Sequence, residues 1–414
     1  MLRRSCPLLL LCVLVARDAP AYGVLAHEAV IDAVWDKSIV PILLARFHPT
    51  EEELTKARAY AYGGALIQDL GYYPFSSQIF GDLTHYVRAG DFVTALVGEA
   101  CDVNEYAFAL GALSHYTADT LGHPLAVNPS VALIYPKLRA KYGNQVTYEQ
   151  NPAAHLKTEF AFDVIQIARG AYVPTTYHSF IGFEVAKPVL ERAFRDTYGL
   201  ELTDVFGDLD MSIGTFRYAV NTMIPQMTKV AWQTKKDEIT ALVPGVNQQK
   251  FMFGLSRPEY EKEWGTTYEH PGLWSKILAI VLRIVPKVGP FSGLAFKMPT
   301  PAAESLFVKS FTAAIERHRA ALQSASRSRP ALENLNLDTG KPVKAGEYHR
   351  ADEAYETLLD RLHAQNYQQV PPALRANLLG FFSNFPAAAV AKHDRKRRAK
   401  VELEIEQLKT LAAN

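Results

Sequence analysis

Three side chains at four-residue intervals carry the clearest chemical signal in the chain. His115, Asp119 and His123 are spaced i, i+4 and i+8, so on an α-helix they share one face. Each four-residue step along a helix rises about 6 Å, which places the two histidines about 12 Å apart along the axis. Zinc binds histidine nitrogen at about 2 Å, so one ion cannot reach both rings. The spacing therefore predicts at least two metal ions, with Asp119 free to bridge them.

More histidines and carboxylates lie on either side of this motif. His155 and Glu159 repeat the i, i+4 spacing, and Asp69 and His85 precede His115 in the chain. Taken singly, each has an ordinary explanation, because a His–carboxylate pair on a helix is more often a solvated ion pair than a metal site. A lone aspartate is usually a helix cap or a loop carboxylate. Their ordered combination in one chain is what favours a multinuclear zinc site.

The amino-terminal stretch combines a cleavage signal with a further ligand. Residues 1–21 have a basic start, an apolar run and small residues at Ala19 and Ala21, which is typical of a secretory signal peptide. Cleavage after Ala21 would make Tyr22 the amino terminus, and its free amine could chelate a cation together with its carbonyl. His27 follows five residues later. We therefore expect an exported protein, secreted or periplasmic, whose processing completes the metal site.

In their order along residues 22–159, these motifs resemble the zinc-dependent phospholipase C family, which shares its fold and trinuclear zinc site with the S1/P1 nucleases. The resemblance implies three Zn²⁺ ions per chain. It implies one zinc held by Asp69, His85, His115 and Asp119, a second held by His123, His155 and Glu159, and a third held by Tyr22, His27 and Asp119. It also makes Asp69 and Asp119 the catalytic candidates: Asp119 bridges the ions that flank the attacking water, and Asp69 is either a ligand alone or also the general base.

The chain departs from the family pattern in two places. The usual first residue is Trp, whereas here it is Tyr22, which keeps the backbone ligands. The better-known secreted phospholipases and nucleases place the next histidine six residues after the bridging aspartate, whereas His123 follows Asp119 by four. That spacing is more similar to the amino-terminal domain of glycosylphosphatidylinositol-specific phospholipase D. The main expectation is a phospholipase C acting on a glycerophospholipid. Phospholipase D-type cleavage of a glycosylphosphatidylinositol-like lipid and S1/P1-type single-strand nuclease activity are the alternatives.

Composition is typical of an exported globular enzyme. The chain has 414 residues, of which 48% are hydrophobic and 21% charged, enough for one large core or two ordinary ones. Without residues 1–21 it carries 41 basic and 42 acidic residues, a net charge of −1. This balance gives no electrostatic argument for binding a polyanion, so nucleic acid is the less favoured partner. A purely structural zinc site is disfavoured because such sites are closed by four side chains and are rich in cysteine.

Apolar residues recur at three- and four-residue intervals along most of the chain, while strand signals are scarce, which predicts an all-α fold. The resemblance implies that this fold is a multi-helix phospholipase C/P1 nuclease-like domain with a helical C-terminal extension. Helices are expected at residues 28–35, 51–65, 106–120, 155–170 and 185–198. Turn chemistry predicts a connection at Gly63 and Gly64. Gly122 and Pro124 are expected to end the helix that carries the first motif, which lets His123 turn towards a separate site.

The expected divisions are a signal peptide over residues 1–21, a catalytic domain over 22–232, a helical continuation over 233–329, a linker or surface loop over 330–345 and a C-terminal helical region over 346–414. The continuation contains an apolar segment at 273–285, which is too short to span a bilayer. Burial in the core is the main interpretation, and peripheral contact with a membrane surface is the alternative. After the signal peptide no stretch is long enough to span a membrane.

Overall fold

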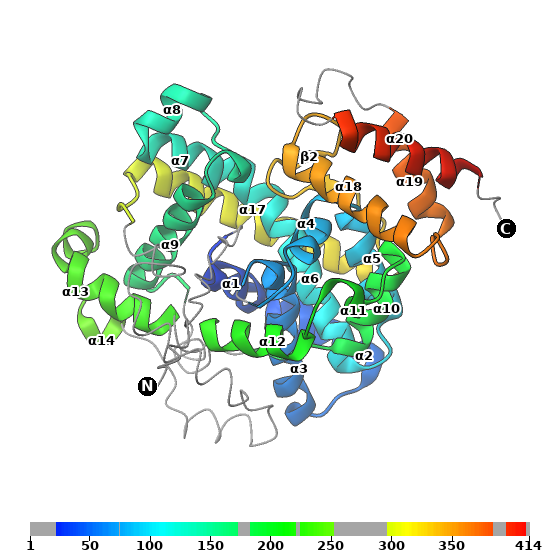
Figure 1. The fold of residues 1–414 in the computed structure, drawn as a ribbon. Helices are drawn as coiled ribbons and strands as arrows, with labels where there is room; N and C mark the ends of the chain where they lie inside the picture. Colours follow the sequence, from blue (N-terminus) through cyan, green and yellow to red (C-terminus); the bar gives the residue numbers. More distant parts are fainter. Residues whose placement is uncertain are drawn as a thin grey trace, which may run out of the picture.

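The fold is known from a computed structural model, which describes residues 22–73, 75–172, 183–220, 224–251, 296–383 and 395–410. Within these ranges the fold is almost entirely helical, which confirms the all-α prediction (Figure 1). The predicted signal peptide at 1–21 and the apolar segment at 273–285 lie outside the described residues. No helix in the described part of the chain is long and apolar enough to cross a membrane.

The first group of helices builds the centre of the molecule. It consists of α1 (Val24–Val34), the π-helical turn η1 (Trp35–Ile39), α2 (Val40–Phe47), α3 (Glu51–Ile67), the short turn η2 (Gln68–Tyr72), α4 (Gln78–Tyr86), α5 (Ala89–Glu99) and α6 (Val103–Gly122). Helix α6 is buried along almost its whole length and packs against α1, α3, α5 and α17. A helix that is buried on most sides forms the core of a domain, so α6 is the axis of the fold.

The second group follows without a long connection. It consists of the π-helical turn η3 (His123–Val127), α7 (Asn128–Ile134), α8 (Pro136–Tyr142), the short turn η4 (Tyr148–Gln150), α9 (Pro152–Arg169), α10 (Lys187–Tyr198), α11 (Leu202–Val205), α12 (Leu209–Tyr218), α13 (Ile224–Leu242) and α14 (Gln248–Phe251). The α-helical hydrogen bonding of α6 ends at Gly122, but the chain does not leave the helical conformation there, because the π-helical η3 leads directly into α7. The five helices expected from periodicity are all present, as α1, α3, α6, α9 and α10.

Gly63 and Gly64 lie inside α3, so the connection predicted there is wrong. A Cβ atom on Gly64 would lie 1.8 Å from the carbonyl oxygen of Phe108 on α6, and one on Gly111 would lie 2.0 Å from the carbonyl oxygen of Ala61 on α3. The missing side chains let the two helix backbones approach closely. These glycines therefore serve helix packing rather than a turn.

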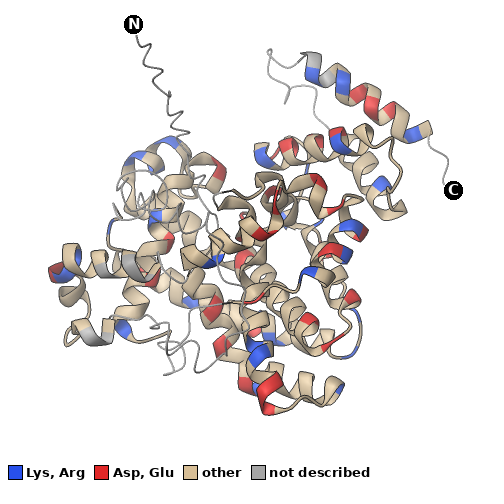
Figure 2. Ribbon diagram, turned by 60° about the horizontal axis from the view of Figure 1, so that its bottom comes forward, with Lys and Arg blue, Asp and Glu red and all other residues tan. Residues whose placement is uncertain are grey.

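The remaining elements are α17 (Pro301–Ala325), β1 (Leu335–Asn336), β2 (Lys341–Pro342), α18 (His349–Ala364), α19 (Pro372–Ser383) and α20 (Arg395–Thr410). The two strands form a small antiparallel hairpin. Helix α17 crosses behind α6 and also packs against η3 and α7 (Figure 1). Basic residues occupy the first half of α20 and glutamates follow at 402, 404 and 406 (Figure 2). Lys400 of this helix pairs with Asp360 of α18 at 2.8 Å. Exposed pairs of this kind add little stability.

The stretch 330–345, interpreted from its polar composition as a linker or surface loop, is partly buried. Leu335, Asn336, Leu337 and Asp338 are at most 4% exposed, and the Leu337 amide donates to the carbonyl of His85 at 3.1 Å. Its polar side chains can be buried because they are hydrogen-bonded: the Asn336 side-chain oxygen accepts from the Asp338 amide at 3.0 Å. The segment therefore packs against α4, close to the predicted metal ligands.

Candidate metal centre

The nine residues predicted as ligands come from separate parts of the fold and are all buried, each at most 3% exposed. They are Tyr22 just before α1, His27 on α1, Asp69 on η2, His85 on α4, His115 and Asp119 on α6, His123 at the start of η3, and His155 and Glu159 on α9. Charged and imidazole groups are seldom fully buried unless they are paired or coordinate metals. Their common burial therefore indicates a functional centre.

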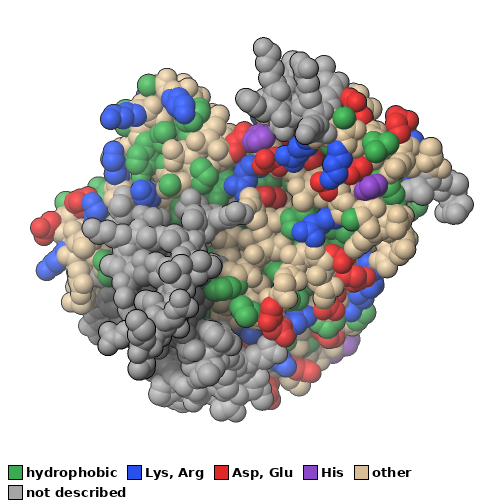
Figure 3. All heavy atoms as spheres, in the orientation of Figure 1, with side chains coloured by type: hydrophobic (Ala, Val, Ile, Leu, Met, Phe, Trp, Pro, Cys, Tyr) green, Lys and Arg blue, Asp and Glu red, His purple; other side chains and the backbone are tan. Residues whose placement is uncertain are grey.

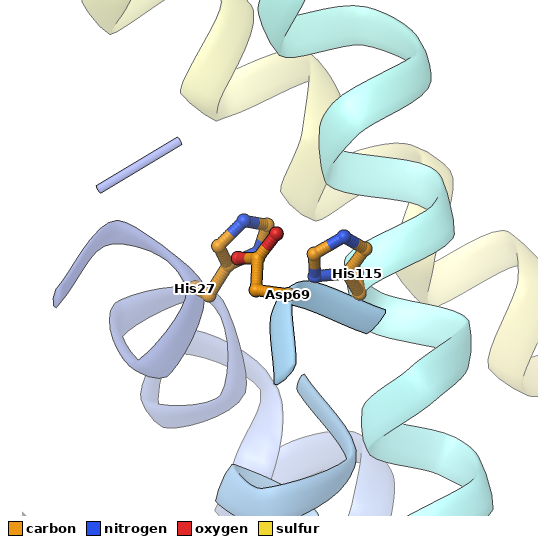
Figure 4. Close-up of side chains that lie close together, drawn as sticks. All are labelled: His27, Asp69 and His115. Atoms are coloured by element: carbon orange, nitrogen blue, oxygen red, sulfur yellow. The ribbon is translucent and has the colours of Figure 1, made fainter. Parts of the chain in front are cut away.

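The first part of the centre surrounds the middle of α6. Ligand atoms of His27, Asp69 and His115 lie within 4.8 Å of one another (Figure 4), and so do those of His85, His115 and Asp119. The two oxygens of Asp119 face different partners: Oδ1 lies 3.3 Å from His27 Nε2, and Oδ2 lies 3.1 Å from His115 Nε2. This carboxylate can therefore contact two ions at once.

The second part lies where η3 meets α9. Ligand atoms of His123, His155 and Glu159 also lie within 4.8 Å of one another, and His155 Nδ1 is 3.6 Å from Glu159 Oε1. His123 Nε2 is 3.9 Å from Asp119 Oδ2, so the aspartate lies between the two parts. The structure thus brings His123 to a different group of residues from His115, as the helical spacing predicted.

Three of the imidazole rings have one nitrogen fixed by a backbone carbonyl. The contacts are His85 Nδ1 to Gly81 O at 2.8 Å, His115 Nδ1 to Ala65 O at 2.9 Å and His155 Nε2 to Val146 O at 2.5 Å. A neutral ring that donates its N–H to a carbonyl carries its lone pair on the other nitrogen, where it can bind a metal. The Nε2 atoms of His85 and His115 lie 3.3 Å apart, a separation that suits a shared cation.

Several atoms of the centre have no hydrogen bond within the described residues. They include His27 Nδ1, Asp69 Oδ1, His155 Nδ1 and Glu159 Oε1. An unsatisfied buried polar group costs about 1–3 kcal/mol, and more if it is charged. Imidazole nitrogens and carboxylate oxygens are also the donors that zinc takes at catalytic sites. The residues present therefore fit zinc, which would supply the missing partners.

The electrostatics of the centre lead to the same conclusion. Burial, reinforced by the charges of Asp69 and Asp119, raises the pKa of Glu159 well above its usual range. Burial would also raise the pKa of Asp119, but His115 and His27 outweigh it and lower that pKa well below its usual range. Burial lowers the pKa of His115, yet Asp119 and Asp69 raise it to about 9. So many buried carboxylates need positive charge among them, from protons or from metal ions.

Tyr22 is buried and contacts residues of α17. Its ring packs edge-on against Phe307 at a centroid distance of 5.3 Å, and its hydroxyl group hydrogen-bonds with Ser310. Nearby, Asp163 of α9 accepts backbone hydrogen bonds from the first turn of α1. These contacts give the Tyr22 ring its packing and a polar partner. Tyr22 is thus held firmly beside His27, at a ring distance of 6.1 Å.

We expect Gly122→Ala to displace the Tyr22 ring and to lower the zinc content by about one ion per chain. A Cβ atom at this position would lie 2.3 Å from Cε2 of Tyr22, in a rigid ring that cannot bend away. Elemental analysis of the processed protein measures the loss. Gly380→Ala is the control, because nothing lies within 4 Å of the added carbon. An unchanged zinc content in Gly122→Ala would show that the ring position does not matter.

Comparison with known families finds one match, to zinc-dependent phospholipase C, over residues 26–208. These residues form a zinc-dependent phospholipase C domain. Searches of curated proteins and of solved structures found no match. The chain is therefore a zinc-dependent hydrolase of phosphodiesters. Eight of the predicted ligands lie inside the matched phospholipase C domain, and Tyr22 lies just before it.

Sequence reasoning missed three residues that support the phospholipase C centre. Phe307 and Ser310 hold the Tyr22 ring, and Asp338 Oδ1 lies 3.3 Å from His123 Nδ1. All three lie beyond residue 208, where the match ends. No spacing rule connects them to the ligands, because they reach the centre only through tertiary packing.

Proposed function

We propose that the protein is a phospholipase C that hydrolyses a glycerophospholipid by attack of water on the phosphodiester. The observation that carries this proposal is the buried arrangement of histidines and carboxylates around Asp119, inside a zinc-dependent phospholipase C domain. Bound zinc polarises phosphoryl oxygens and lowers the pKa of water to about 7. The family implies a phospholipid substrate. The near-neutral charge gives no comparable support for nucleic acid.

The proposed ligands are those named from the family resemblance, with three zinc ions per chain. Asp119 faces groups on two sides, which supports its assignment as the bridging carboxylate. Asp69 Oδ1 has no hydrogen bond among the described residues, so it is free to bind metal or to accept a proton from the attacking water. We propose that signal cleavage after Ala21 frees the Tyr22 amine and that the enzyme is secreted or periplasmic.

The direct test incubates processed, zinc-loaded protein in parallel with phosphatidylcholine vesicles, a glycosylphosphatidylinositol and single-stranded DNA. The proposal predicts diacylglycerol from phosphatidylcholine. Release of phosphatidic acid from either lipid would instead identify phospholipase D-type cleavage. Release of nucleotides alone would identify a nuclease and contradict the proposal.

A surface at the start of the second helix group supports contact with a lipid layer. Leu125 and Leu133 are 47% and 37% exposed, although most large apolar side chains are buried. Residues 124–148 contain three basic residues, all exposed on α8, and no acidic residue. Figure 3 shows hydrophobic and basic side chains beside one another over α7 and α8, at the upper left. Apolar side chains flanked by basic ones suit an anionic phospholipid surface.

We expect Leu133→Glu to weaken binding to anionic phospholipid vesicles several-fold, because it removes the exposed part of an apolar side chain and adds a negative charge that an anionic surface repels. Sedimentation with vesicles measures the binding. The melting temperature and the turnover of a soluble short-chain substrate should stay unchanged, because the side chain is exposed. Leu44→Glu, on α2 and 42% exposed, is the matched control. Equal vesicle binding by both variants and the wild type would rule out this surface.

A further inference from the structure

A carboxylate from outside the matched domain approaches the metal centre. Asp338 follows strand β1 and is 2% exposed. Its Oδ1 lies 3.3 Å from Nδ1 of His123, and both groups are almost completely buried. Among the described residues neither of these two atoms has a hydrogen-bond partner. They therefore face each other at a distance from which a small rotation of the ring makes a hydrogen bond.

The position of Asp338 is fixed by three other contacts. Its Oδ2 accepts hydrogen bonds from the Tyr148 amide at 2.9 Å and from the Tyr348 hydroxyl at 2.8 Å. Its backbone carbonyl accepts from Asn128 Nδ2 at 2.9 Å. Among the described residues, Oδ2 and the backbone carbonyl oxygen of Asp338 accept hydrogen bonds, whereas Oδ1 accepts none. The carboxylate is thus held in one orientation, with Oδ1 directed at His123.

The second nitrogen of the His123 ring, Nε2, faces Asp119 in the metal centre. This nitrogen lies 3.9 Å from Asp119 Oδ2. One ring nitrogen of His123 lies within 4.8 Å of ligand atoms of His155 and Glu159. In His155 the nitrogen that points away from the centre is held by a backbone carbonyl. For His123 the corresponding contact is with the side chain of Asp338. A histidine that donates Nδ1–H to a carboxylate is fixed in one tautomer and becomes a more basic zinc ligand.

We propose that Asp338 is the positioning residue for His123: it accepts the Nδ1–H and keeps Nε2 unprotonated towards the zinc shared with His155 and Glu159. This inference rests on the zinc centre proposed above. It also gives the C-terminal part a role, because residues 296–383 then complete a site whose ligands lie in the phospholipase C domain. The domain over 26–208 would lack this residue if it were produced alone.

The test compares zinc affinities of processed full-length protein by competition with a chelator. Wild type should hold three ions. Asp338→Ala should weaken one of them by about 10–100-fold, the usual effect of removing the partner of a ligating histidine. Asp338→Asn, which keeps an acceptor oxygen without its charge, should lie in between. Tyr348→Phe is the matched control: it removes one hydrogen bond from the same carboxylate but leaves Oδ1 and His123 in contact, so zinc affinity should change little.

The melting temperature of the chelated, metal-free protein separates positioning from a structural role. Positioning predicts that Asp338→Asn lowers the melting temperature of the zinc-loaded form more than that of the metal-free form. Equal losses in both forms, or three ions bound with wild-type affinity in both Asp338 variants, would overturn the proposal. A wild-type protein with fewer than three ions would instead contradict the zinc centre itself. The two failures are therefore distinguishable.

Discussion

Protein that carries one extra residue ahead of Tyr22 should bind two zinc ions instead of three and lose most of its activity. Extension converts the free amine into an amide, which no longer binds the metal, while Phe307 and Ser310 still hold the ring in place. A catalytic metal contributes several kcal/mol to transition-state stabilisation, and each 1.4 kcal/mol is tenfold in rate, so we expect a loss of at least about 100-fold. Elemental analysis and turnover of phosphatidylcholine measure the two effects.

The same ligand makes this zinc sensitive to pH. The free amine has a pKa of about 7.7–8.0, and only its unprotonated form binds metal. Protonation therefore competes with zinc increasingly as the pH falls, and the zinc on Tyr22 should be the first to be released. The extended protein serves as the control, because it lacks this ion at every pH. Equal activity and zinc content of the extended and processed proteins would contradict the role of the amine.

Asp119→Asn should remove more than one zinc ion per chain and abolish most of the hydrolytic activity. The substitution keeps the shape of the side chain but removes the negative charge that faces His27 on one side and His115 on the other. Because one carboxylate serves two ions, its loss should weaken both. Zinc content by elemental analysis is the measurement, with circular dichroism to show that α6 is still folded.

A histidine outside the centre provides the comparison for Asp119. The His349 side chain is 77% exposed and pairs only loosely with Glu353, so His349→Gln should retain three zinc ions and wild-type activity. If Asp119→Asn retained three ions as well, a bridging role for this aspartate would be excluded.

Sequence alone could predict those ligands of the centre that lie at helical spacing from one another along the chain. His115, Asp119 and His123 lie on one helix and the turn after it, so the period of the helix determines their separation. The pair His155 and Glu159 on α9 follows the same rule. Periodicity also predicted the helices themselves, because each has one or more faces buried against its neighbours.

The parts that could not be predicted depend on contacts between distant segments. Glycine is common in turns, so the sequence predicts a turn at Gly64. Only the close approach of the α3 and α6 backbones shows that this glycine serves helix packing. Ser310 and Asp338 reach Tyr22 and His123 across more than 200 residues of chain, so no local pattern connects them. The sequence predicts that a polar stretch such as 330–345 is exposed. It does not show the hydrogen-bond partners from distant segments that allow these polar groups to be buried in the folded chain.

The most direct test of this account is anomalous diffraction at the zinc absorption edge from crystals of the processed enzyme. The account predicts three zinc peaks at about 2 Å from the named nitrogen and oxygen atoms, one of them shared by His123, His155 and Glu159 and two of them in contact with Asp119. Fewer peaks, or zinc bound away from these residues, would contradict it.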